Sequence, residues 1–164
     1  MFLLLVVRRI DGMATPQFWA EDGTVFFQQN LDLGCWRALH TLLRGFPYLG
    51  QRLVACAATS LPFIAVPAVY SLVAYLASAA AIATFSVPSF RHVIRSDGLR
   101  VLLCLALAAL PQATQLLGSL TNTSWFLGMW LVLLTLMRVP ASASSTCALA
   151  GANLLAAFSS PLSV

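Results

Sequence analysis

Three long stretches without an acidic or basic side chain dominate the sequence, and they cover residues 53–87, 101–137 and 139–164. A helix that spans the hydrocarbon core of a bilayer needs about 20 apolar residues, and each stretch is longer than that. Charged side chains make up 9% of the sequence, whereas soluble domains carry about 25%. This composition argues against an ordinary soluble fold, because too little polar surface remains to cover a buried core. We therefore expect an all-α, polytopic transmembrane helix bundle, a single membrane domain over residues 1–164.

Prolines and polar residues divide these stretches into shorter helices. The first stretch would be about 52 Å long as one helix, against a bilayer core of about 30 Å, so it must break, and Leu61-Pro62 is the expected place. The second stretch has a polar middle and predicts a helical hairpin; Gln112 and Gln115 in it either bond to a neighbouring helix or line a polar cavity. The third breaks at Pro140. The sequence thus predicts a short inserted helix at 49–60, a hairpin turn at 118–123, and spans at 63–87, 100–117, 124–138 and 144–162.

Arginines set the expected orientation, and the chain has nine basic residues, all of them arginine. A helical hairpin separates the connection 88–100 from Arg138, so both must lie on one side of the membrane, where they hold four arginines. The positive-inside rule puts that side in the cytoplasm. Segment 8–52 is then outside; it holds five arginines but also four of the five acids, for a net charge of +1. We expect a multi-pass protein of the cell (inner) membrane, with residues 11–50 outside and lipid rather than nucleic acid as its partner.

Neither the first residues nor the cysteines suggest another class of protein. The start of the chain lacks the basic region and the cleavage site of a signal peptide, and residues 1–10 instead look like the remnant of a first span. The cysteines are widely spaced and show neither a CxxC pair nor a Cys/His spacing typical of a metal site. We interpret them as small apolar residues that fill space between helices. They are Cys35, Cys56, Cys104 and Cys147.

The outer segment 11–50 predicts short helices that lie flat on the membrane surface. An apolar run followed by a polar run at residues 25–30 indicates one interfacial helix. Apolar residues at helical spacing from Trp36 to Leu43 indicate a second one, and Gly34 separates the two.

The adjacent carboxylates Glu21 and Asp22 are the first candidates for chemistry. The chain has only five acidic residues, and an acid at the mouth of a membrane bundle costs free energy unless it is solvated or used. One interpretation is structural: Asp22 caps a helix that starts at Gly23, and Glu21 lies near the same positive helix end. The other is functional: a carboxylate acts as a general base or metal ligand that faces a lipid-borne substrate.

The polar residues that follow also have two interpretations. Arg44 and Arg52 bind a phosphate or pyrophosphate, or their charged ends reach lipid headgroups. The polar residues from Thr121 to Ser124 open a span, where capping of the helix is the default role.

Several short motifs occur in an order that resembles a group of bacterial multi-pass membrane proteins. They are the acidic motif Phe18–Phe26, Gly34, Pro47–Gly50 with Arg52, a proline-broken apolar stretch, and Leu117-Gly118 with Thr121-Asn122 and Trp125. This layout is similar to that of GT-C type glycosyltransferases, which use polyprenyl-phosphate sugars. In that superfamily the first outer loop carries an acidic motif and short membrane-parallel helices.

The resemblance implies a reaction and roles for individual residues. Glu21 or Asp22 would be the catalytic base of an inverting transfer, with no basis for choosing between them. Arg52 and Arg44 would bind the lipid phosphate of the donor, and Tyr48 and Asn122 would also bind substrate. The donor would be a polyprenyl-phosphate sugar, and the acceptor a glycan, lipid or protein of the cell envelope. No cofactor is certain: a divalent metal stays open, although the 118–124 turn lacks the second acid that some relatives have there.

The chain departs from that family in its number of spans. Members usually have more spans than this chain supplies, so the sequence resembles an N-terminal fragment, and such a fragment could be inactive. The alternative is a non-enzymatic integral membrane protein, either a transporter of lipid-linked glycans or a structural subunit. In that alternative Glu21 and Asp22 serve only as a helix cap. A defective remnant without function is a third possibility.

Overall fold

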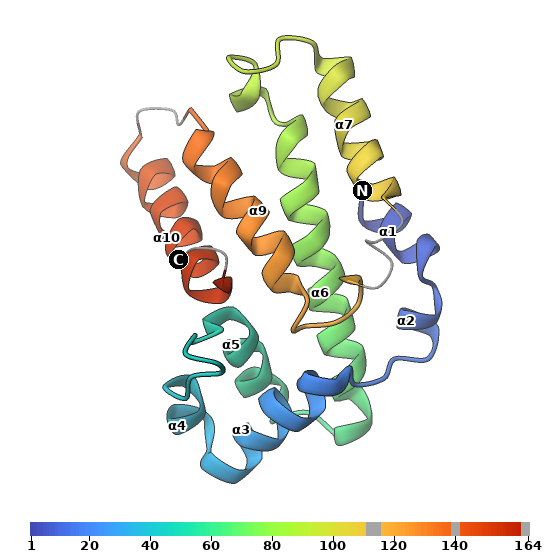
Figure 1. The fold of residues 1–164 in the computed structure, drawn as a ribbon, viewed down its shortest axis with the longest axis vertical. Coiled ribbons are helices and arrows are strands. Elements are labelled where there is room, and N and C mark those ends of the chain that lie inside the picture. Colours follow the sequence, from blue (N-terminus) through green and yellow to red (C-terminus); the bar gives the residue numbers. More distant parts are fainter. Residues whose placement is uncertain (111–115, 139–141, 162–164) are drawn as a thin grey trace.

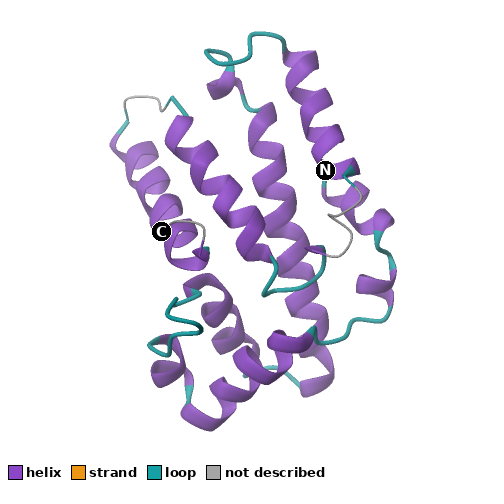
Figure 2. Ribbon diagram, viewed as in Figure 1, coloured by secondary structure: helices purple, strands orange, loops and turns teal. Residues whose placement is uncertain are grey.

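The computed structural model describes residues 1–110, 116–138 and 142–161, and these residues form a bundle of helices without a β-strand (Figures 1 and 2). The expectation of an all-α fold is confirmed for this part of the chain. Gln112, Gln115 and Pro140 lie outside the described residues. The α-helices are α1 Phe2–Arg8, α2 Asp11–Ala14, α3 Gln28–Leu33, α4 Cys35–Leu39, α5 Leu49–Ala58, α6 Val66–Ala83, α7 Asp97–Ala109, α9 Thr123–Leu136 and α10 Ala143–Ser159. The remaining helical turns are a π-helix η1 Asp22–Phe27 and the 3-10 helices η2 Phe63–Ala65, η3 Thr84–Ser86 and η4 Pro88–Phe90.

Helix α6 lies at the centre of the bundle, in contact with α1, α7 and α9, and α10 packs on α9 and α5 (Figure 1). Together with η2 and η3, α6 forms a continuous helix over Phe63–Ser86, with 24 residues and a mean hydropathy of 1.8. A helix of that length rises about 36 Å, which is enough to cross a bilayer core of about 30 Å. In the described part of the chain it is the one helix both long and apolar enough to do so, while α9 and α10 are shorter apolar helices.

The other bundle helices are shorter than the spans expected from the sequence, and prolines explain two of the three cases. The residue after α7, Leu110, precedes Pro111 and is extended, with ψ of 128°. The residue after α10, Ser160, precedes Pro161 and is extended as well, with ψ of 122°. The proline ring clashes with a helical conformation of the residue before it. The expected spans at 100–117 and 144–162 are too long because the charge-free sequence continues past each proline, whereas the helix does not. The helices cover 97–109 instead of 100–117, 123–136 instead of 124–138, and 143–159 instead of 144–162.

The segment expected outside folds into short helices that gather at one end of the bundle, the lower end in Figure 1. η1, α3 and α4 all pack against α5. Gly34, with φ of 75°, lies between α3 and α4, and glycine adopts that left-handed conformation at little cost.

Two apolar clusters share α6 as a common wall. The first surrounds Tyr75 and Ile82 and includes side chains of α1, α7 and α9. The second surrounds Val66 and Tyr70 and includes Phe26 of η1 and alanines of α5. The second cluster therefore holds the π-helix that begins at Asp22 against the central helix.

A disulfide joins α4 to α5, between Cys35 and Cys56, whose Cα atoms lie 5.1 Å apart. The interpretation of these two cysteines as apolar filler is therefore wrong. It holds better for Cys104, which is buried between helices and donates a hydrogen bond to the carbonyl oxygen of Ile82 at 3.2 Å. No local sequence pattern predicts the pairing, because the two cysteines meet only when α4 packs against α5.

Candidate functional site

A carboxylate from the outer segment holds the turn between α7 and α9. Asp22, the first residue of η1, is only 1% exposed. One carboxylate oxygen accepts a hydrogen bond from the backbone N–H of Leu120 at 2.9 Å. The other accepts from the backbone N–H of Thr121 at 2.7 Å and from the Thr121 hydroxyl at 2.6 Å. These bonds tie η1 to a turn that is distant along the chain.

This arrangement differs from the capping role that the sequence suggests for the acid pair. No side chain caps the first turn of η1. Burial raises the pKa of the Asp22 carboxyl, and the hydrogen bonds from Thr121 and Leu120 oppose that rise. Because the Asp22 side chain is buried and both its oxygens are engaged, its position suits fixing the turn rather than meeting a substrate.

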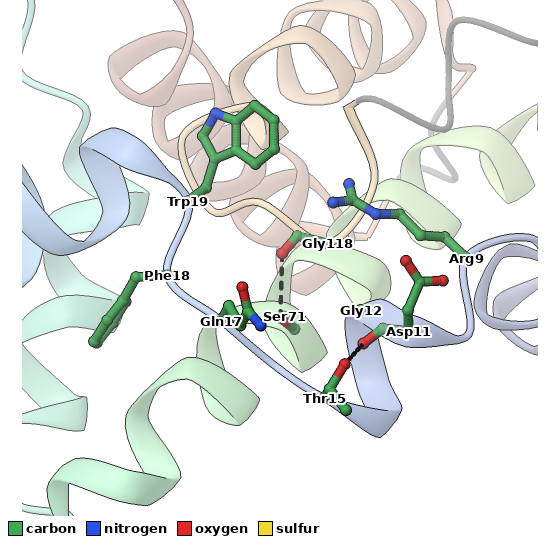
Figure 3. A pocket seen from close by; sticks show the side chains of 9 residues that line it. All are labelled: Arg9, Asp11, Gly12, Thr15, Gln17, Phe18, Trp19, Ser71 and Gly118. Carbon is green, nitrogen blue, oxygen red and sulfur yellow. Dashed lines mark hydrogen bonds between the residues drawn. The ribbon is translucent and has the colours of Figure 1, made fainter.

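Two further contacts fix the same turn, and Figure 3 shows the one between Ser71 and Gly118. The hydroxyl of Ser71 donates to the carbonyl oxygen of Gly118 at 3.2 Å, and the guanidinium of Arg9 donates to that of Leu117. Gly118 has φ of 77°, and a Cβ atom there would lie 3.3 Å from the ring of Tyr75. Both the left-handed backbone and the close ring therefore favour glycine at this position. The turn is held from α1, α6 and η1 together.

Four of the residues selected from the sequence line one cavity beside this turn. Glu21, Arg44, Tyr48 and Asn122 border a cavity of about 310 Å³. Glu21 is half-buried and Arg44 is exposed, so an acidic and a basic side chain meet the same space. A carboxylate can take a proton from a hydroxyl, and a guanidinium can bind a phosphate with paired hydrogen bonds. The other lining residues are Trp19, Leu116, Thr121, Ser124, Trp125 and Pro161.

Two of the cavity residues have a left-handed backbone, which is unusual for residues other than glycine. Arg44 has φ of 53° and Tyr48 has φ of 50°, and no other non-glycine residue in the described ranges has a positive φ. Arg44 and Gly45 form a tight turn, closed by the N–H of Leu43 donating to the carbonyl of Phe46 at 2.8 Å and by the reverse bond at 3.0 Å. A left-handed conformation costs an ordinary residue about 1–2 kcal/mol, and such strain concentrates at functional sites. Asparagine or glycine is the usual residue at this position of a tight turn. A role for the Arg44 guanidinium in binding would explain why arginine occupies the position instead.

Arg52, the first candidate for the donor phosphate, does not border this cavity. Its side chain is 1% exposed. It donates to the carbonyl oxygen of Pro47 and to Oε1 of Gln29, each at 3.1 Å, and its guanidinium lies 5.6 Å from the centre of the Phe26 ring. With these contacts Arg52 supports the loop before α5, and of the two arginines that the resemblance selects, Arg44 is the one that borders the cavity.

An apolar cavity adjoins the polar one. It has a volume of about 180 Å³ and lies between α6, α7 and α9. The two cavities share Leu116 and Trp125 as lining residues. A ligand with a polar head and an apolar tail fits such a pair. The other residues of the apolar cavity are Ile82, Leu107, Leu110, Phe126 and Met129.

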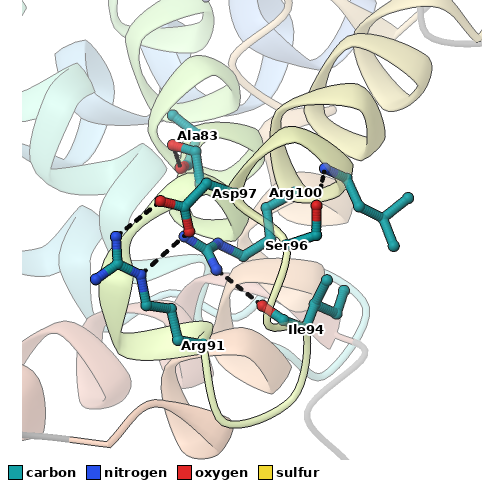
Figure 4. Close-up of polar contacts among 8 residues, drawn as sticks. Ala83, Arg91, Ile94, Ser96, Asp97 and Arg100 are labelled. Atoms are coloured by element: carbon teal, nitrogen blue, oxygen red, sulfur yellow. Dashed lines mark hydrogen bonds and ion pairs between the residues drawn. The ribbon is translucent and has the colours of Figure 1, made fainter.

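A charged cluster lies at the opposite end of the bundle, where the chain leaves α6 and enters α7 (Figures 1 and 4). Asp97 pairs with Arg91 at 2.7 Å and with Arg100 at 2.6 Å. Arg100 also donates to the carbonyl oxygen of Ile94 at 2.8 Å, and Ser96 caps α7 by accepting from the N–H of Leu99 at 3.2 Å. Hydrogen bonds from the two guanidinium groups lower the pKa of Asp97 to about 2.

Sequence reasoning missed part of the site. It did not select Trp19 or Trp125 as site residues, although both line the cavity and are 42% and 52% exposed. A signal for the strained turn was available, since Arg44-Gly45 lies between two large apolar residues. For a metal, the described residues contain no group of three His, Cys, Asp or Glu side chains that could hold the ion together.

Comparisons with known proteins add no relative: no family model, no curated protein and no solved structure matches the chain. The geometry alone therefore defines the class. Over the residues that the structure describes, it is an all-helical protein with one helix long and apolar enough to cross a membrane, and with a cavity that pairs a carboxylate and a guanidinium beside an apolar cavity.

Proposed function

We propose that this chain belongs to a polytopic membrane protein of GT-C type, which transfers a sugar from a polyprenyl-phosphate donor to a cell-envelope acceptor. One observation carries this proposal. Glu21 and Arg44 share a cavity, and that cavity shares Leu116 and Trp125 with an apolar one. A lipid-linked sugar phosphate has the matching parts: a hydroxylated head, a phosphate and a hydrocarbon tail.

The two ends of the bundle support the orientation. The disulfide between Cys35 and Cys56 belongs to the end that carries the cavity, and disulfides persist in oxidising compartments such as the bacterial periplasm. The connection between α6 and α7 carries arginines and lies at the other end, as expected for a cytoplasmic side. Helices α6, α7, α9 and α10 alternate in direction along the bundle, which suits a multi-pass arrangement (Figure 1). We infer that all four lie in the inner membrane, with residues 11–50 outside.

The cavity residues divide the proposed reaction between them. The Glu21 carboxylate takes the proton from an acceptor hydroxyl, whose oxygen attacks the anomeric carbon of the donor sugar. The bond between that carbon and the phosphate oxygen breaks, and the lipid phosphate leaves with the bonding electrons. Arg44 stabilises the charge that develops on this phosphate. Tyr48 and Asn122 offer hydrogen bonds to the sugar hydroxyls, and inversion at carbon follows from the single displacement.

The apolar cavity would take the part of the isoprenoid tail nearest the phosphate. Its wall consists of aliphatic and aromatic side chains, from α6, α7, α9 and the residues next to them. Burial of hydrocarbon against these side chains contributes affinity for the donor without affecting the acceptor.

The experiment is sugar transfer from radiolabelled polyprenyl-phosphate sugars in membranes that contain the chain. We expect Glu21→Gln to reduce transfer by about 100-fold or more, because it keeps the size of the side chain and removes the base. Asp32→Asn is the matched control. It removes another carboxylate of the outer segment, one that accepts a hydrogen bond from Gln28 on the surface of α3, and should leave transfer unchanged.

The outcomes separate the enzyme from the non-enzymatic alternative. Full transfer by Glu21→Gln would remove this carboxylate from catalysis. Absence of transfer by the wild-type chain across a broad panel of donors would favour a transporter or structural subunit. Loss in Glu21→Gln with retention in Asp32→Asn supports the proposed role.

A further inference from the structure

We propose that a second polar cavity, which shares Trp19 with the first, binds a glycan as the acceptor of the transfer. The acceptor role rests on the proposed function, whereas binding of a glycan is testable by itself. The cavity has a volume of about 200 Å³, and Arg9, Asp11, Thr15 and Gln17 bring polar groups to it from one segment of the chain, opposite Ser71 and Gly118 (Figure 3).

The position of this cavity suits an acceptor. Trp19 lines both polar cavities, so they meet at one indole ring. The turn held by Asp22 also borders both: Gly118 lines the second cavity and Asn122 lines the first. A ligand bound in the second cavity needs to extend only past Trp19 to bring a hydroxyl to Glu21.

The side chains suit a neutral ligand with many hydroxyls. Carboxylate, amide and guanidinium groups are planar and form paired hydrogen bonds with neighbouring hydroxyls, and an indole face packs against the apolar side of a sugar ring. The guanidinium of Arg9 lies 5.8 Å from the centre of the Trp19 ring and donates to the carbonyl of Leu117, so both groups are held in position. Asp11 balances the charge of Arg9, which favours a neutral glycan over a second phosphate.

The same turn couples the two cavities. Ser71 and Arg9 hold its first residues, at the second cavity, and Asp22 holds the following ones, at the first. Ligands in the two cavities therefore contact the same turn. Contact with one turn keeps the acceptor hydroxyl and the donor sugar at a fixed distance and orientation.

The test measures binding of methyl α-glucoside, methyl α-mannoside and methyl α-galactoside to the full chain in detergent, by saturation-transfer NMR. We expect at least one probe to bind, and Gln17→Ala to raise its dissociation constant about five- to tenfold, the effect of one lost hydrogen bond. Gln17 is exposed, so the variant should fold, and its thermal unfolding is measured alongside. The matched control is Gln28→Ala on α3, which removes the amide that donates to Asp32, and should leave binding unchanged.

A comparison with Glu21→Gln distinguishes the two cavities. This variant should bind the glycoside as the wild type does, because Glu21 borders the other cavity. The proposal is overturned if no probe binds, if Gln17→Ala binds like the wild type, or if Glu21→Gln weakens binding as much as Gln17→Ala. Failure of the proposed function has a different signature, in which glycoside binding depends on Gln17 but no donor supports transfer.

Discussion

Two aspartates at opposite ends of the bundle, Asp22 and Asp97, have almost opposite environments. Asp22 is 1% exposed and accepts three hydrogen bonds from Leu120 and Thr121. The Asp97 side chain is 58% exposed and pairs with two arginines. Burial raises the pKa of Asp22, whereas hydrogen bonds from the guanidinium groups lower the pKa of Asp97 to about 2.

The difference explains why a site with fixed geometry can form at one end and not at the other. Water cannot replace the hydrogen bond from the backbone N–H of Leu120 to Asp22 when it breaks, because both groups are buried. Water and salt can replace the ion pairs of Asp97, which are exposed. The end that carries Asp22 therefore holds its turn in one arrangement, while the contacts of Asp97 at the basic end can exchange with water and salt.

The largest expected effect comes from removing the buried aspartate. Asp22→Ala leaves the buried backbone N–H of Leu120 without an acceptor and removes both hydrogen bonds from the half-buried Thr121, at a total cost of about 3–5 kcal/mol. We expect the unfolding temperature in detergent, measured by circular dichroism, to fall by about 10 °C or more. Asp97→Ala is the matched change at the basic end and should shift it far less. Equal shifts for the two variants would contradict the contrast between buried and exposed contacts.

Sequence reasoning predicts the parts of this molecule that depend on local chemistry. Composition predicted the all-helical fold of the described residues, and of the residues selected from the sequence, Glu21, Arg44, Tyr48 and Asn122 line one cavity, whereas Asp22 does not. Choosing between Glu21 and Asp22 required the fold, since they are adjacent and their difference lies in contacts with Leu120 and Thr121, far along the chain.

Other features also depend on contacts that no local pattern contains. The pairing of Cys35 with Cys56 and the burial of Arg52 both arise when the loop before α5 folds onto α3 and α4. Helix lengths were overestimated because the charge-free sequence continues past Pro111 and Pro161, whereas the backbone before each proline does not stay helical.

The second prediction concerns the disulfide, which stabilises the same end. Cys35 and Cys56 are 21 residues apart in sequence, and closing a loop of this size stabilises a fold by about 3 kcal/mol. Cys35→Ser with Cys56→Ser should lower the unfolding temperature, and reductant should do the same to the wild type. Cys147→Ser changes an exposed free cysteine and serves as the control. Alkylation of both Cys35 and Cys56 in unreduced, freshly isolated membranes would contradict both the bond and the outer location of this end.

The third prediction tests the protonation of Asp22. Its folded pKa is raised above the ordinary 3.8, so the carboxyl contributes stability that is present below the unfolded pKa and is lost as pH rises through the folded pKa. Asp22→Asn keeps the shape and cannot ionise. The stability of the wild type relative to this variant should therefore decrease as pH rises from below 3.8 through the folded pKa. Chemical unfolding at a series of pH values measures it, and an increase over the same range would mean that the hydrogen bonds outweigh burial.

The smallest expected effect comes from the backbone of Arg44 and has the opposite sign. Asparagine tolerates a left-handed φ better than arginine, so Arg44→Asn should stabilise the fold by about 0.5–1 kcal/mol. Arg91→Asn, at the basic end, should not stabilise the fold, because Arg91 has φ of −59° and its backbone is not strained. This variant also loses the ion pair with Asp97. If the Arg44 guanidinium binds the donor phosphate, the stabilised variant should also show a raised KM for the donor, measured in the same preparation. A variant with higher stability and unchanged KM would mean that the strained turn serves some purpose other than presenting this guanidinium to the cavity.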